Sequence, residues 1–218
     1  MSISRFFIQR CLFFLLGTFL LGVGVALSTR SGLGTTPISS VPYVLSRIVP
    51  LSFGTWTFLF NILFVLAQIF ILRRNYDWRQ LVQLAAVFLL GIFIDVGMAL
   101  SAFYHPAHYA AQVVELLLGS ALIAVGVSLQ ILSDISYVPG DGLVDAISRK
   151  FAIPFGKVKW GVDSFLVALA LVLAMAILGK PVGIREGTLL AACMIGPLIH
   201  VLITRLQRVF RPLGKPHF

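Results

Sequence analysis

Charged residues are scarce in this chain. Only 11% of its 218 residues are Asp, Glu, Lys or Arg, against about 25% in an ordinary soluble domain. Hydrophobic residues make up 59%. This composition excludes a water-soluble globule, and the polar stretches, none longer than about a dozen residues, leave no room for a soluble catalytic domain.

Cysteine is also rare. The two cysteines, Cys11 and Cys193, both lie in apolar runs, so neither a disulfide scaffold nor a Cys-X-X-Cys metal or redox site is predicted. The sequence also offers no complete set of nucleophile, base and metal ligands. We therefore expect neither an enzyme nor a bound metal or cofactor.

What the chain does contain is a series of long apolar runs, and its mean hydropathy is +0.99. A run of about 20 apolar residues can cross a bilayer as a helix, because a helix satisfies its own backbone hydrogen bonds. We expect such spans over 6–28, 53–72, 81–103, 110–132, 156–178 and 188–206. The sequence thus predicts an all-α polytopic membrane protein with one membrane domain over 1–218, ending in a basic tail over 207–218.

Two polar segments interrupt this pattern. The segment Gly32-Leu33-Gly34-Thr35-Thr36-Pro37 is too rich in glycine to continue a helix, and it ends with residue types preferred at a helix start. The stretch from Asp134 to Pro139 forms a second break, directly before Gly140-Asp141-Gly142. Each break precedes a short segment, over 37–47 and 140–151. We predict these to be re-entrant half-helices, whose irregular backbone must be buried in protein or line a polar cavity.

The two halves of the chain repeat each other at a constant offset of 102. Residues 15–61 aligned without a gap on residues 117–163 give 14 identities in 47 positions. This similarity predicts two copies of one unit, over about 6–103 and 110–206. Because each unit has three full spans, an odd number, the second must enter the membrane from the opposite side, which gives an inverted repeat.

Basic residues predict the orientation. With the N-terminus inside, 13 of the 17 Lys and Arg residues fall on the inner side and four, Arg30, Arg47, Lys180 and Arg185, on the outer side. We therefore expect cytoplasmic N- and C-termini. The net charge of +9 is then a topology signal, and no nucleic-acid partner is predicted.

The two breaks carry the first group of candidate binding residues. The start of the first half-helix would offer free N–H groups and a positive dipole end to an anionic group. At the second break, carboxylates take the matching place, although Asp141 could also simply cap its own helix. Together they predict a site for a zwitterion, or for a cation paired with an anion. These candidates are Thr35, Thr36, Ser39, Ser40, Asp141 and Asp145.

Polar residues inside the spans form the second group. Asn61 and Asp163 share one repeat position, and a carboxylate there costs about 2.5–3.5 kcal/mol. They either bind substrate or a coupling proton, or form an interhelical hydrogen bond. Asp95 and His200, each four residues after a glycine, are candidates for a proton-linked pair, unless His200 only bonds to the backbone. Glu115 is expected to reach the membrane interface.

The motifs around the breaks resemble a known family. The segments Gly32 to Pro37, Leu51-Ser52-Phe53-Gly54, Pro139 to Gly142 and Phe155-Gly156 are similar to those of the bacterial YczE/YyaS/YitT family of small integral membrane proteins. The resemblance covers nearly the whole chain. It implies a six-span, multi-pass protein of the bacterial inner (plasma) membrane.

Two classes of function remain open. The first is a secondary transporter or exporter of a small polar or charged metabolite, with its site between the half-helices. The second is a non-transporting membrane module that docks a partner protein, such as a biosynthetic enzyme or the energising subunit of a carrier, on its basic inner loops. The expected partners are a small-molecule substrate, the lipid bilayer and a second copy of the chain. A polar cavity favours the transporter, and a sealed apolar interior favours the module.

Overall fold

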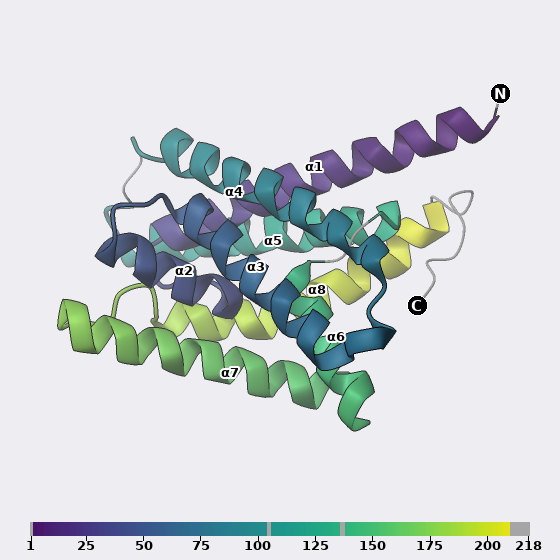
Figure 1. Cartoon of the computed structure of the whole chain (residues 1–218). Helices are drawn as coiled ribbons and strands as arrows, with labels where there is room; N and C mark the ends of the chain where they lie inside the picture. Colours follow the sequence, from purple (N-terminus) through teal and green to yellow (C-terminus); the bar gives the residue numbers. More distant parts are fainter. Residues whose placement is uncertain (1, 104–105, 136–137, 210–218) are drawn as a thin grey trace.

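The computed structural model describes residues 2–103, 106–135 and 138–209, and within them the chain is built from helices without strands. The end of the predicted basic tail, 210–218, lies outside the described residues. The helices are α1 (Ser2–Arg30), α2 (Pro37–Ile48), α3 (Phe53–Leu72), the short η1 (Arg73–Asn75) and η2 (Trp78–Leu81), α4 (Val82–Leu100), α5 (Tyr109–Ser133), α6 (Pro139–Phe151), α7 (Phe155–Leu173), the π-turn η3 (Ala174–Leu178) and α8 (Glu186–Val209) (Figure 1).

Six of these helices are long and apolar enough to cross a membrane: α1, α3, α4, α5, α7 extended by η3, and α8. Their bounds agree with the predicted spans to within a few residues. Large apolar side chains cover their outer faces; Phe70 and Trp160, for example, are each 73% exposed. Such surfaces suit contact with lipid rather than water. The prediction of an all-α, multi-pass membrane protein is confirmed.

The two short helices α2 and α6 have 12 and 13 residues, which is about 18–20 Å of helix against a hydrocarbon core of about 30 Å. They lie toward opposite ends of the long helices (Figure 1). Gly32 and Gly34 end α1 with φ angles of +75° and +120°, which glycine adopts at little cost. Pro37 then begins α2 at its first turn, where proline needs no hydrogen-bond partner.

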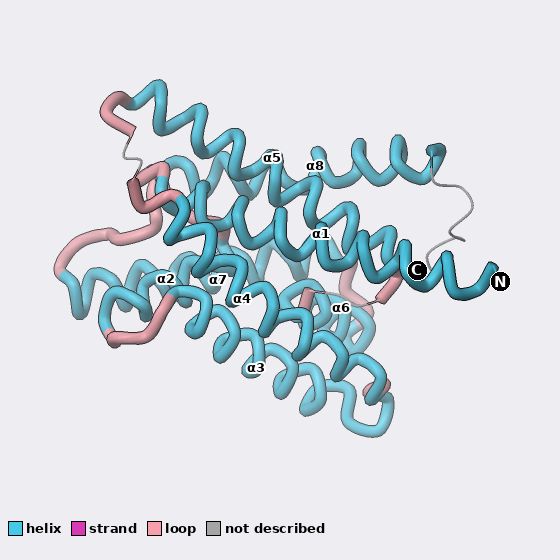
Figure 2. Tube along the Cα trace, turned by 90° about the horizontal axis from the view of Figure 1, so that it is seen from above, coloured by secondary structure: helices cyan, strands magenta, loops and turns pink. Residues whose placement is uncertain are grey.

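α1 and α5 pack closely at the centre, and α4 lies along the other side of α1 (Figure 2). Glycines allow this approach. A Cβ atom built on Gly24 would lie 2.8 Å from the Gly119 carbonyl oxygen, and one built on Gly17 would lie 2.7 Å from that of Gly126. Since the contact position rises along α1 as it falls along α5, the two helices are antiparallel.

The two ends of the bundle are not packed alike. α3 meets α4 where Gly54 touches the Gly91 backbone, too closely to leave room for a side chain on Gly54. In the second half, Gly156 on α7 is the counterpart of Gly54, and Gly196 on α8 follows Gly91 by 105 positions, three more than the repeat offset. Neither glycine has an atom within 4 Å of an added Cβ. The second pair of helices therefore stands apart at the matching point.

This difference predicts unequal responses to the same substitution. Gly54→Ala should lower the free energy of unfolding by about 1–3 kcal/mol, because its methyl group would overlap the Gly91 carbonyl. Gly156→Ala meets open space and should change it by at most about 0.5 kcal/mol. Thermal unfolding of the two variants in detergent measures the difference. Equal effects would show that the two helix pairs are packed alike.

Candidate functional site

A large cavity lies at the α6 end of the molecule. Its volume is about 1090 Å³, and helices of both halves contribute to its wall. The wall includes exposed residues of the α3–α4 connection, such as Asn75, and of the end of α6, such as Lys150, so the cavity opens at this end. The polar groups that face it come from Gln68, Gln83, Gln130, Asp141, Asp145 and Lys159, among others.

Three buried glutamines provide the amide groups. Gln68 on α3 donates from Nε2 to the Pro139 carbonyl (2.9 Å), which fixes α3 to the start of α6. Gln83 on α4 donates to Gln68 Oε1 (3.3 Å) and to the Tyr76 hydroxyl (3.2 Å). Burial raises the pKa of Tyr76, so this hydroxyl stays protonated. Gln130 on α5 lies at the same cavity.

These glutamines were not among the predicted site residues. The signal for them was present, because each interrupts an apolar span, and a polar side chain there requires a partner. Gln130 illustrates this, since its Nε2 donates to Thr18 Oγ1 on α1 at 2.8 Å. The sequence did not reveal that all three side chains would meet one cavity.

An ionic cluster completes the site. The Lys159 ammonium on α7 lies 3.1 Å from Asp141 Oδ1 on α6. It also lies 3.2 Å from Asp163 Oδ1, an ion pair without hydrogen-bond alignment. Two carboxylates thus share one ammonium. Asp145, nearer the mouth, pairs with Arg149 one helical turn later (2.8 Å). From the sequence, Lys159 was only one of the basic residues that indicate topology, whereas the structure places its ammonium between the two carboxylates.

The predicted pair of Asn61 and Asp163 does not meet directly. Asn61 is 2% exposed, its Nδ2 donates to the Thr57 carbonyl of its own helix (2.8 Å), and its Oδ1 has no hydrogen-bond partner. Asp163 instead belongs to the cluster around Lys159. The two residues therefore occupy different surroundings on α3 and α7.

The predicted residues of the first break lie at the start of α2 and do not line the cavity. Thr35 accepts from Thr29 Oγ1 (2.9 Å), Thr36 donates to Ser39 (2.9 Å), and Ser40 donates to the carbonyl at the start of its own helix (2.6 Å). All four hydroxyls thus have local partners.

The two short helices α2 and α6 do meet, through an apolar contact. The Ile38 side chain of α2 fills the space beside Gly140 of α6, with its Cδ1 2.8 Å from where a Cβ of that glycine would stand. These residues are 102 positions apart, so each is the counterpart of the other in the repeat. The cavity therefore reaches the first turn of α6. The first turn of α2 lies on the other side of the contact between Ile38 and Gly140, away from the cavity.

Asp95 and His200 are not joined by any hydrogen bond or ion pair within the described ranges. Asp95 accepts from the Gly54 backbone N–H (2.8 Å) and from the Ser52 hydroxyl (2.6 Å), so it caps the start of α3. The His200 side chain lies on an exposed part of α8. The predicted proton-linked pair therefore has no contact in this conformation.

The expectation that Glu115 reaches the membrane interface is wrong. Its side chain is 5% exposed, and neither carboxylate oxygen has a hydrogen-bond partner. Packing of α5 against α1 and α8 covers it. The guanidinium of Arg30, at the end of α1, interacts electrostatically with the Glu115 carboxylate. The same guanidinium donates a hydrogen bond to the Met98 carbonyl (3.0 Å).

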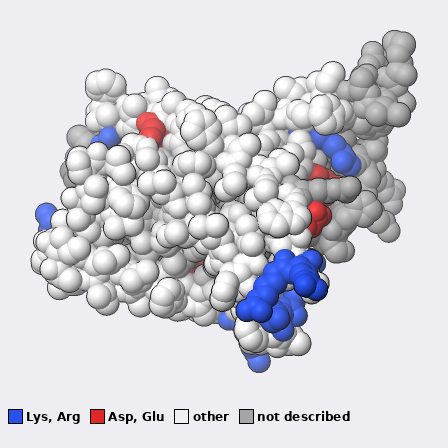
Figure 3. Space-filling model, viewed as in Figure 1, with Lys and Arg blue, Asp and Glu red and all other residues white. Residues whose placement is uncertain are grey.

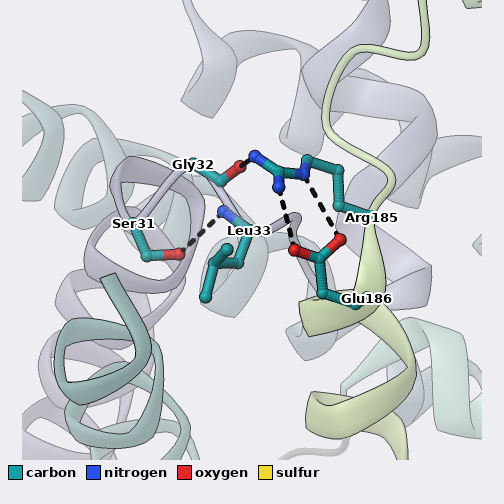
Figure 4. A network of polar contacts seen from close by, with 5 residues as sticks. All are labelled: Ser31, Gly32, Leu33, Arg185 and Glu186. Carbon is teal, nitrogen blue, oxygen red and sulfur yellow. Dashed lines mark hydrogen bonds and ion pairs between the residues drawn. The ribbon is translucent and has the colours of Figure 1, made fainter. Parts of the chain in front are cut away.

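At the α2 end, polar contacts join segments that lie far apart in the sequence. Figure 4 shows Arg185 donating to the Gly32 carbonyl (3.1 Å) while its guanidinium pairs with Glu186 (2.9 Å). The Gly187 N–H donates to the Leu33 carbonyl (2.9 Å). These contacts fasten the α7–α8 connection to the break between α1 and α2. The cavity thus opens toward the α6 end, while these contacts hold the helices together at the α2 end.

Comparison with known proteins finds similarity over nearly the whole chain. A family described as a family of unknown function, DUF6198, matches residues 8–204. The chain is 28% identical to the uncharacterized protein YyaS of Bacillus subtilis (strain 168) over 205 residues, which is 93% of this chain and 96% of that protein. It is 27% identical to the uncharacterized membrane protein YczE of the same organism over 195 residues, 88% and 84% of the two chains. No solved structure matches. Since the match extends from the first helix to the last and includes every wall of the cavity, the chain belongs to the DUF6198 family, with YyaS and YczE among its relatives.

Proposed function

We propose that this protein is a secondary transporter or exporter of a small polar or zwitterionic metabolite, bound in the cavity at the α6 end. One observation carries the proposal: membrane-spanning helices enclose a cavity of about 1090 Å³ lined by amides and ion pairs. Buried polar groups are expensive in a membrane and mark solute or ion pathways. The volume is also enough for a metabolite, since ligand pockets commonly measure about 300–1,000 Å³.

The charges in the cavity favour a zwitterion. Asp141 and Asp163 share the single ammonium of Lys159, and Asp141 lines the cavity, where a cationic group of the solute can pair with its carboxylate. Lys159 can in turn bind a carboxylate of the solute. The amides of Gln68 and Gln83 can accept from or donate to neutral polar groups. A solute with one positive and one negative group uses all three features.

We also propose that the two halves are inverted repeats related by a twofold axis in the membrane plane. Two sets of contacts support this. Gly17 meets Gly126 and Gly24 meets Gly119, and these two contacts exchange under the offset of 102. Ile38 meets its own counterpart, as a residue near a twofold axis does. In this arrangement α2 and α6 are re-entrant half-helices that enter from opposite sides.

The α6 end is the cytoplasmic side in this proposal, and the membrane is the bacterial inner membrane. Lys and Arg side chains gather at this end (Figure 3), and they include the exposed Arg73, Arg74, Arg149 and Lys150. Short basic segments remain on the inner side during insertion. The cavity then opens to the cytoplasm.

Cysteine labelling tests this orientation. In a chain whose native cysteines are replaced by serine, Asn75→Cys should resist a membrane-impermeant thiol reagent in intact cells, and Lys180→Cys should react at once. Both positions are exposed in the structure, so burial does not explain a difference. Labelling of Asn75→Cys from outside would reverse the assignment.

Transport itself can be tested with purified protein. A thermal-shift screen of amino acids, betaines and other small zwitterions should reveal a stabilising solute, since a ligand at about 100 times its dissociation constant stabilises by about 2.7 kcal/mol. Liposomes containing the protein should then exchange the labelled form of that solute faster than empty liposomes. A stabilising solute that is bound but never exchanged would contradict the proposal.

The same basic surface supports the second candidate function. A non-transporting module could present Arg73, Arg74, Arg149 and Lys150 to an acidic partner protein. Charge reversal at Arg73 and Arg74 would then release the partner from the membrane without changing solute binding. Exchange of solute by the purified chain in liposomes would show that docking is not its sole activity.

A further inference from the structure

We infer that the cavity is closed at the α6 end when α8 docks on the start of α7, in the way that α4 is already docked on the start of α3. The inference rests on the proposed transport function, which requires a state in which the cavity is shut at this end. Its basis is a set of counterpart residues that are in contact in one half and apart in the other.

The closed pair shows what docking involves. Gly54 at the start of α3 lies against the Gly91 backbone of α4, and no side chain separates the two helices. Asp95, one turn further along α4, accepts from the Gly54 N–H (2.8 Å) and from the Ser52 hydroxyl (2.6 Å). The helices are therefore joined by a glycine contact and by a side chain that caps α3.

The same residue pattern recurs on α8. Gly91 to Val96 of α4 reads Gly-Ile-Phe-Ile-Asp-Val, and Gly196 to Val201 of α8 reads Gly-Pro-Leu-Ile-His-Val. The glycine, the isoleucine and the valine keep their places, and His200 stands where α4 has Asp95, at an offset of 105. The three additional positions, relative to the offset of 102, fall between the start of α7 and this part of α8. The start of α7 likewise repeats the Phe-Gly pair that opens α3.

In the second half these counterparts are apart, and two of them, Phe155 and Gly196, line the cavity. Gly156 and Gly196 have no atom within 4 Å of an added Cβ. Phe53 is 5% exposed, whereas its counterpart Phe155 is 46% exposed and lines the cavity. Gly196 also lines the cavity. The surfaces that are pressed together at one end therefore form opposite walls of the cavity at the other.

The start of α7 also lacks the cap that α3 has. The residue before its first turn is Pro154, which provides no side-chain hydrogen bond, whereas Ser52 accepts from Thr55 N–H at the start of α3. A neutral imidazole has one nitrogen that accepts a hydrogen bond. Docking of α8 would bring His200 to the uncapped N–H groups of α7, as Asp95 is brought to those of α3.

Closure by this route would shut the solute in. Part of the cavity lies between α7 and α8. There it is lined by Phe155 and Lys159 on α7 and by Gly196 and Ile199 on α8. Bringing the two helices together would cover Lys159 and Asp141 from the α6 side. The contacts that now hold the α2 end together, such as Arg185 with Gly32, would open in exchange if the two halves swap conformations.

Cross-linking of paired cysteines in the full chain tests this docking. Ser52→Cys with Asp95→Cys is the control pair, because these side chains already touch at 2.6 Å. Pro154→Cys with His200→Cys is the counterpart test pair. In liposomes, with Cys11 and Cys193 replaced by serine, an oxidant should cross-link both pairs, the test pair more slowly. A disulfide requires Cα atoms within about 7 Å, so it reports docking directly. Complete cross-linking of the control pair with none in the test pair would overturn the inference.

A matched pair of valine variants checks that the glycine contact is responsible. Gly156→Val should lower the cross-linking rate of the test pair by about tenfold or more, because the added side chain prevents close approach. Gly161→Val, on the same helix and also in open space, should leave the rate unchanged. Neither should alter folding, which thermal unfolding verifies. Equal rates in both variants would exclude docking through Gly156.

A third measurement separates failure of this inference from failure of the proposed function. Val127 lines the cavity on α5, and Val127→Cys should react with an impermeant thiol reagent from both sides of the membrane if the protein alternates. Reaction from both sides without cross-linking of the test pair would mean that another element closes the cavity. Reaction from the α6 side alone would contradict transport itself and the inference with it.

Discussion

Lys159→Met is expected to abolish solute-dependent stabilisation and to weaken the fold. The substitution removes the ammonium that lies between Asp141 and Asp163 and leaves two carboxylates facing each other in a membrane protein. Breaking a fully buried ion pair costs about 3–5 kcal/mol. Here the side chains are 28%, 41% and 21% exposed, so solvent screening reduces the expected loss to about 1–3 kcal/mol. Thermal unfolding with and without the screened solute measures both effects.

A neighbouring lysine provides the control. Lys157→Met, at an exposed position two residues earlier on α7, should change neither stability nor solute response. Asp163→Asn, which is nearly isosteric, should remove solute response with a smaller loss of stability, about 0.6–2 kcal/mol. The ion pair would be only a structural link if the folded Lys159→Met and Asp163→Asn variants kept full solute response.

Gln68→Leu should have the second large effect. The substitution removes the hydrogen bond to the Pro139 carbonyl (2.9 Å) and the acceptor of the Gln83 amide. Unpaired buried groups of this kind cost about 1–3 kcal/mol each. Because the Pro139 bond fixes the start of α6 at the cavity, solute affinity should fall together with stability. Solute titration followed by thermal shift measures the loss of affinity.

The matched change lies outside the cavity. Gln112→Leu replaces a glutamine of α5 whose amide is near Gly32 at the opposite end, the α2 end. It should leave solute affinity unchanged. A comparable loss of affinity in both variants would show that glutamine substitutions act through general destabilisation rather than through the cavity.

The sequence by itself determined the helices and their ends. Apolar runs of span length, the helix-starting proline at Pro37 and the glycines Gly32 and Gly34 act locally, so they can be interpreted without knowing what packs against them. The repeat could be detected for the same reason, because identities at a fixed offset require no contact information. Asp141 and Asp145 were correctly expected near a break, since their place follows from the start of α6.

The tertiary structure alone decided which polar groups meet. Lys159 lies four residues after the start of α7, and only the position of α6 against α7 turns it from a topology signal into the partner of Asp141. From the sequence, Asp95 was a candidate for a proton-linked pair, and the packing of α4 on α3 places it as a cap of α3. Glu115 is buried because α5 packs inside the bundle. The cavity itself depends on α7 and α8 standing apart where α3 and α4 touch. Two halves with matching motifs can hold their last two helices either in contact or apart. The helices themselves are the same in both arrangements, so the difference in free energy between the arrangements comes from the contacts between helices.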